Sequence, residues 1–106
     1  MMKDTQAIEK VERDGKVAVI VSPGHGAGWS TWATDLGAAA VFAPDVVAWI
    51  EAGKVGDTGF AERYGYIGGL GEAEIEWVNK GERFYIDEYD GHESLVIMGP
   101  DYGYVA

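Results

Sequence analysis

The chain has no cysteine among its 106 residues, which excludes disulfides, thiolate metal ligands and a cysteine nucleophile. Basic residues are scarce too, with 8 lysines and arginines against 18 acids and a net charge of −10. Binding to a phosphate backbone needs many bases, so no direct nucleic-acid partner is expected. The chain also lacks a run of 18 apolar residues and an apolar stretch in its first ten. We therefore expect no membrane partner and a cytoplasmic location.

The acidic surplus has two interpretations. It can simply keep a small domain soluble. Alternatively, an acidic surface can mimic a nucleic acid and block a protein that binds one. The length of 106 residues predicts a single domain over 1–106, with one modest core.

Residues 16–22, KVAVIVS, form a β-branched run with apolar side chains at both odd and even positions. This pattern is typical of a strand that is buried on both faces. The polar residues 1–14 before it are expected to form a short helix or a tail, and Asp14-Gly15 predicts a turn.

The middle of the chain predicts two short helices. Pro44 suits the first turn of one helix, residues 46–50 supply its apolar face, and Gly53 follows its last turn. Residues 57–65 predict a second helix that ends at Gly65.

Residues 73–79 and 83–90 alternate between apolar and polar side chains, which predicts two strands, and the run SLVIM at 94–98 predicts a third. Turn signals at 79–82 and 90–91 separate these three strands. The predicted fold class is therefore α+β. It consists of one buried N-terminal strand, a glycine-rich loop, two short helices and a three-stranded antiparallel meander that the early strand joins.

The stretch 22–32, SPGHGAGWSTW, places three glycines in five residues directly before two tryptophans and two hydroxyl side chains. Glycines let backbone N–H groups converge on an anion, and an adjacent tryptophan can form an aromatic wall. The phosphate-binding patterns GxxxxGK[ST] and GxGxxG are both missing. The same residues also fit a tight turn whose tryptophans, three positions apart, fill the core.

We expect a ligand site in this loop, assisted by the arginines best able to reach a ligand phosphate. His25 would be a general base or a phosphate contact, or simply an exposed loop histidine. Valine at Gly26 or Gly28 would then sharply lower ligand binding and leave the core folded. The residues of this predicted site are Ser22, Gly24, His25, Gly26, Ala27, Gly28, Trp29, Ser30, Thr31, Trp32, Arg63 and Arg83.

We expect no catalytic residues, no bound metal and no cofactor. A triad of Ser30, His25 and Asp35 is too local in sequence and lacks the GxSxG pattern. Residues 87–93, DEYDGHE, could offer oxygen ligands to a divalent cation, but they fail the EF-hand order. A solvated acidic hairpin is the preferred interpretation of that segment.

The segments VAVIVSPGHGAGWSTW, GYIGG and EIEWVNKGERFYIDEYDGHESL cover most of residues 16–97. Together they resemble a set of short proteins that bacteriophages and related mobile elements encode. The resemblance implies a phage context and the cytoplasm of an infected bacterium. It does not identify any catalytic residues. Small accessory proteins in that context often act against host defence.

Three classes of function remain open. The first is a binding protein, a sponge that sequesters a nucleotide-like signalling molecule through the glycine-tryptophan loop. The second is an acidic inhibitor of a host defence protein or a nucleic-acid-binding protein, and the third is a small hydrolase. Because four tryptophans and six tyrosines are many for one small core, we also expect a homo-oligomer.

Overall fold

A computed structural model describes residues 9–24, 26–33, 36–56, 59–97 and 103–106. The fold is α+β, as predicted, with two three-stranded antiparallel sheets of strand order β1-β2-β3 and β5-β4-β6. The elements in chain order are β1 (Glu12–Arg13), β2 (Lys16–Val21), α2 (Ala38–Val41), α3 (Pro44–Glu51), α4 (Phe60–Tyr64), the 3-10 helix η1 (Leu70–Glu72), β3 (Glu74–Asn79), β4 (Arg83–Tyr89), β5 (His92–Ile97) and β6 (Tyr104–Val105).

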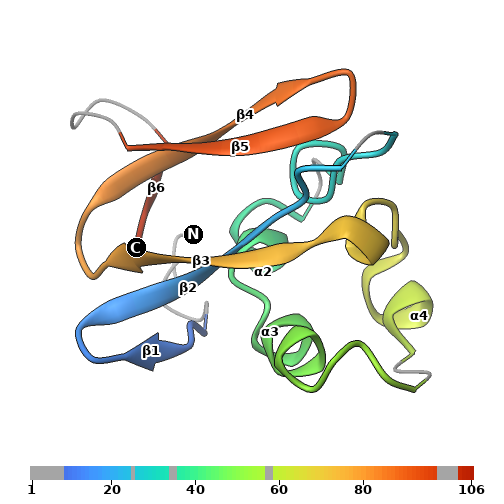
Figure 1. Ribbon diagram of the computed structural model, residues 1–106, viewed down its shortest axis with the longest axis horizontal. Coiled ribbons are helices and arrows are strands. Elements are labelled where there is room, and N and C mark those ends of the chain that lie inside the picture. The colour runs from blue at the N-terminus through green and yellow to red at the C-terminus, as the bar shows by residue number, and fades with distance from the viewer. Residues whose placement is uncertain (1–8, 25, 34–35, 57–58, 98–102) are drawn as a thin grey trace, which may run out of the picture.

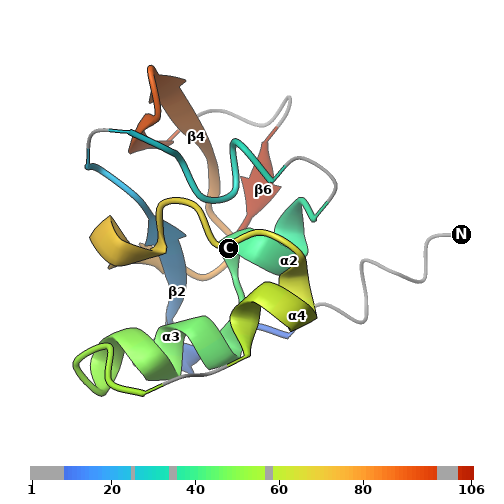
Figure 2. The ribbon, with the colours of Figure 1, turned by 90° about the vertical axis from the view of Figure 1, so that its right-hand side faces the viewer.

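Strand β2 is buried on both faces, which confirms the prediction for this segment. Its even residues, Ala18 and Ile20, belong to a cluster that includes Trp29 and residues of α3. Its odd residues, all valine, pack in a second cluster with Phe42 and Phe84. Figures 1 and 2 show the corresponding layers, with α3 and α4 on one side of β2 and the β4–β5 hairpin on the other.

The three strands predicted in residues 73–98 are present, but the prediction that they pair with one another in a single meander is wrong. Strand β3 pairs with β2, so that Val19 lies opposite Glu76, whereas β4 pairs with β5 and β6. In the turn between β3 and β4, Lys80 N–H donates a hydrogen bond to Gly15 O, and Gly81 N–H donates one to Ala106 O. The chain thus passes from one sheet to the other, and the second sheet covers the valine face of β2.

The two predicted helices are present as α3 and α4, and α2 and η1 are additional helices that the sequence did not predict. Pro44 opens α3, and Gly65 ends α4 in the left-handed conformation, with φ of 71°. Within the segment 1–14, for which a helix or tail was predicted, Glu12–Arg13 is a strand that pairs with β2. Pairing with the edge of β2 decides that conformation, and residues 1–8 lie outside the described part. No helix in the described part of the chain has the length and apolar character to cross a membrane.

Candidate functional site

The glycine-tryptophan loop bends beside the tip of the β4–β5 hairpin, so the two most unusual segments of the sequence are neighbours (Figure 1). An added Cβ on Gly91, in the hairpin turn, would lie 1.4 Å from the carbonyl oxygen of Gly26. Only a residue without a side chain permits this approach, and Gly91 also has a φ of 86°. The loop and the hairpin therefore form one structural unit.

The carboxylate of Glu93 on β5 lies inside this unit and is completely buried. Its Oε1 accepts a hydrogen bond from Ser22 N–H at 3.0 Å. Its Oε2 accepts three, from Trp29 N–H at 2.6 Å, Thr31 N–H at 3.1 Å and the Thr31 hydroxyl at 2.6 Å. A backbone hydrogen bond also joins the two segments, because Glu93 N–H donates to Ser22 O at 2.8 Å. We call Glu93, Ser22, Trp29 and Thr31 the Glu93 junction.

The loop therefore does gather backbone amides around an anion, but that anion belongs to the chain itself. Hydrogen bonds from several N–H groups make burial of a carboxylate tolerable. The interpretation of 87–93 as a solvated hairpin is wrong for Glu93. In the β4–β5 register Glu93 shares the inward face with Leu95, and the loop supplies the donors that solvent would otherwise provide.

A third segment, residues 66–72, closes the loop from the other side. The Tyr66 hydroxyl donates to Gly28 O at 2.6 Å, and the Ser22 hydroxyl donates to Gly69 O at 2.9 Å. Burial raises the pKa of Tyr66, and the negative charge of Glu93 raises it further. The loop backbone is thus held by both neighbouring segments.

Glu88, directly opposite Glu93 in the register, binds the outer end of the loop. Its Oε2 accepts hydrogen bonds from Trp32 Nε1–H at 3.0 Å and from Gly91 N–H at 2.7 Å. The Trp32 bond, followed by the Gly91 bond, holds the pKa of Glu88 below its usual range.

Acid is expected to release Trp32 from Glu88. Because the pKa of Glu88 is lowered in the folded state, the contact is complete above the usual glutamate pKa and is lost as the pH falls through the lowered value. An NMR titration of the Trp32 Nε1–H resonance measures this midpoint, and the Glu88→Gln variant should remove the transition. A midpoint at or above the usual pKa of glutamate would contradict the assignment.

The predicted site residues separate into internal and external groups. Ser22 and Trp29 are fully buried, and the buried Ser30 hydroxyl has no hydrogen-bond partner among the described residues. Trp32 is 48% exposed, so the two tryptophans differ in their environments. Gly24 and Ala27 lie within the same loop, and the position of His25 falls outside the described residues.

The two arginines of the predicted site lie on other elements. Arg63 on α4 forms an ion pair with Asp45 on α3. Arg83 begins β4, opposite Val105, and Tyr89 ends the strand six residues later. At the rise of an extended strand this separates Arg83 from the hairpin tip by about 20 Å. The structure therefore does not bring Arg83 to the loop.

The expectation that valine at Gly28 would leave the core intact is wrong. An added Cβ there would lie 2.6 Å from the Thr31 hydroxyl oxygen and 2.8 Å from Glu93 Oε2. It would therefore disturb the Glu93 junction itself. At Gly26 an added Cβ meets nothing within 4 Å, but the φ of 111° is strained for any other residue.

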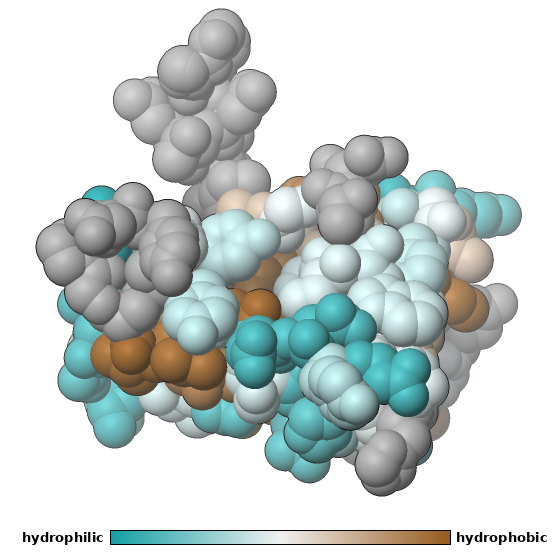
Figure 3. Space-filling model, turned by 90° about the horizontal axis from the view of Figure 1, so that it is seen from above, coloured by the Kyte–Doolittle hydropathy of each residue, from teal (hydrophilic) through white to brown (hydrophobic). Residues whose placement is uncertain are grey.

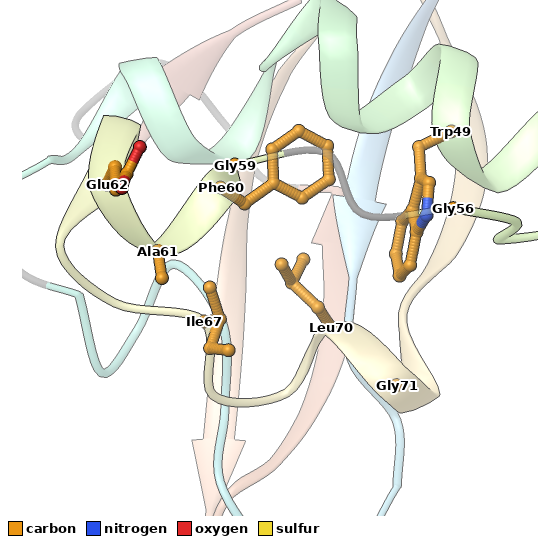
Figure 4. A pocket seen from close by; sticks show the side chains of 9 residues that line it. All are labelled: Trp49, Gly56, Gly59, Phe60, Ala61, Glu62, Ile67, Leu70 and Gly71. Carbon is orange, nitrogen blue, oxygen red and sulfur yellow. The ribbon is translucent and has the colours of Figure 1, made fainter.

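A separate pocket of about 470 Å³ lies between α3, α4 and the 3-10 helix η1 (Figure 4). Trp49, Phe60, Ile67 and Leu70 supply its apolar walls, and glycines 56, 59 and 71 lie at its margins. The indole Nε1 of Trp49 is buried and has no hydrogen-bond partner in the described part of the chain. Volumes of this size are common for small-molecule sites.

Sequence reasoning missed both Glu93 and the pocket. Glu93 stands two residues before Leu95 and, in an extended strand, therefore shares its face, and this was the one sequence signal of an inward position. The pocket residues come from three elements that approach one another only in the folded chain, so no spacing in the sequence indicates them.

The described residues contain no group of three or more histidines and acids placed to hold a metal ion. Comparisons of the chain with protein-family models, with curated proteins and with solved structures give no match.

Proposed function

We propose that the protein is a non-catalytic binding protein that holds a small nucleotide-like ligand in the pocket beside Trp49. The observation that carries this proposal is a cavity of about 470 Å³ with the aromatic side chains of Trp49 and Phe60 in its walls. The loop is a weaker candidate for the site because four of its donors already bind Glu93. A ligand bound there would have to displace that carboxylate.

The resemblance to short phage proteins supports a role for such binding. In this proposal the protein sequesters a signalling molecule of bacterial defence in the cytoplasm of the infected cell. Native mass spectrometry of protein purified from its host tests this role. A retained small molecule is expected, and the same spectrum gives the mass of the assembly and thereby tests the predicted homo-oligomer.

The pocket is tested by matched isoleucine variants. Ile67 lines the pocket and is 51% exposed, and Ile97, on the β5 strand, is 48% exposed and is not among the lining residues. The molecule extracted from the purified protein is titrated back into ligand-free variants by calorimetry. Ile67→Ala should raise Kd about tenfold, because contact with several methylene equivalents is lost. Ile97→Ala should bind as the wild type does.

A filling variant tests the same pocket without removing a contact. An added Cβ on Gly71 meets nothing within 4 Å, and its backbone is not in the left-handed region. Gly71→Leu is therefore expected to fold normally and to lose binding. Wild-type affinity in both Gly71→Leu and Ile67→Ala would exclude the pocket as the ligand site and leave the loop as the candidate.

An inhibitor of a host protein is the second candidate, and one observation favours it. Tyr89 is 82% exposed at the hairpin tip, beside the exposed acids Asp87, Glu88 and Asp90. Figure 3 looks onto the β4–β5 side, where strongly hydrophilic residues adjoin an apolar patch. A stoichiometric host protein in the native spectrum, in place of a small molecule, would support this candidate.

A further inference from the structure

We propose, on the basis of the proposed binding function, that the pocket accepts an uncharged planar aromatic ring system. A nucleotide-like ligand would then enter with its base, and its phosphates would stay outside. The geometry and the charge of the pocket walls both favour this part of the ligand.

The walls are arranged to receive a flat ring. The rings of Trp49 and Phe60 meet edge to face, with centroids 5.5 Å apart and planes at 88°. Figure 4 shows Leu70 facing these rings and Ile67 beside Leu70. A flat ring that stacks on one aromatic wall presents its edge or face to the other, and both arrangements are favourable for aromatic pairs.

The margins of the pocket leave room for such a ring. Glycines 56, 59 and 71 lie among its lining residues, and an added Cβ at any of them meets nothing within 4 Å. The cavity of about 470 Å³ is large enough for a fused pair of rings.

The charges around the pocket disfavour an anionic group inside it. Of the nine described lining residues only Glu62 is charged, and it is an acid. Two cations lie over the aromatic walls, and both already have partners. The Lys54 ammonium, 5.9 Å from the centre of the Trp49 ring, donates to Gly71 O at 2.8 Å. The Arg63 guanidinium, 5.6 Å from the centre of the Phe60 ring, forms an ion pair with Asp45. The net charge of −10 adds a repulsive field for anions.

The indole N–H groups provide a direct reporter of binding. Trp29 Nε1–H is bonded to Ala40 O and Trp32 Nε1–H to Glu88, whereas the buried Trp49 Nε1–H has no hydrogen-bond partner among the described residues. In a 15N-labelled sample the Trp49 resonance is assigned sequentially and by its loss in Trp49→Phe. A ring bound against Trp49 should shift this resonance, and those of Trp29 and Trp32 serve as internal references.

Two matched pairs of probes test shape and charge. Phenol and cyclohexanol share a hydroxyl and six carbons, and only phenol is flat. Indole and indole-3-acetate share a ring system, and only the second is an anion. We expect phenol to shift the Trp49 resonance at concentrations where cyclohexanol does not. At low salt, indole should bind about threefold to tenfold more tightly than indole-3-acetate, and added salt should narrow this difference.

The outcomes separate this inference from the proposed function. Equal binding of cyclohexanol and phenol, or tighter binding of indole-3-acetate, would overturn the ring proposal and leave the pocket as a binding site. A ligand retained in the native spectrum with no response to any aromatic probe would also overturn it. If no molecule is retained and no probe shifts the Trp49 resonance, the proposed function itself fails.

Discussion

Replacing Glu93 by glutamine is expected to lower the free energy of unfolding by about 3 kcal/mol, a large share of the stability of a small domain. The glutamine oxygen can take the position of Oε2, where three donors converge. Its NH₂ group then faces Ser22 N–H, so a donor opposes a donor. Charge-assisted hydrogen bonds are also replaced by weaker neutral ones.

The measurement is urea unfolding followed by fluorescence and circular dichroism, with linear extrapolation. Glu88→Gln is the matched control, since Glu88 lies opposite Glu93 in the register but is exposed. It should cost much less, and Glu93→Ala should cost more than Glu93→Gln because all four accepted bonds are lost. A Glu93→Gln variant that unfolds at the wild-type urea concentration would show that the Glu93 junction is dispensable.

The strands were predictable because their signals are local. Strand β2 shows apolar residues on both faces, and the Asp14-Gly15 and Asp90-Gly91 pairs adopt the positive φ angles that such turns need. Strand pairing was not predictable from the same signals. Whether β3 pairs with β2 or β4 depends on how both faces of β2 become covered, which is a property of the whole fold.

The loop was predictable in its chemistry and not in its partner. The glycines of 22–32 do allow amides to approach an anion, and the anion is supplied by Glu93, more than sixty residues later. The prediction of a solvated hairpin followed the general rule that glutamate is exposed to solvent. The position of Glu93 on the same strand face as Leu95 was the contrary signal. Two unusual segments in one short chain can therefore be complementary to each other rather than to a ligand.

The two tryptophans of the loop are expected to differ sharply when each is replaced by alanine. Trp29 is completely buried, stacks on Tyr66 with ring centroids 5.9 Å apart, and donates Nε1–H to Ala40 O at 2.8 Å. Its removal leaves a large cavity and an unpaired carbonyl, so Trp29→Ala should cost about 3–5 kcal/mol of stability.

Trp32→Ala should cost about 1 kcal/mol or less, because the side chain is 48% exposed and its hydrogen bond to Glu88 lies at the surface. Thermal and urea unfolding of both variants, with binding of the retained ligand measured beside them, gives the comparison.

If Trp29 is a core residue and the ligand lies in the pocket, the Trp32→Ala variant folds normally and binds the ligand normally. A Trp32→Ala variant that keeps its stability but loses binding would instead place the ligand at the outer end of the loop. Equal losses of stability in both variants would contradict the assignment of Trp29 to the core and Trp32 to the surface.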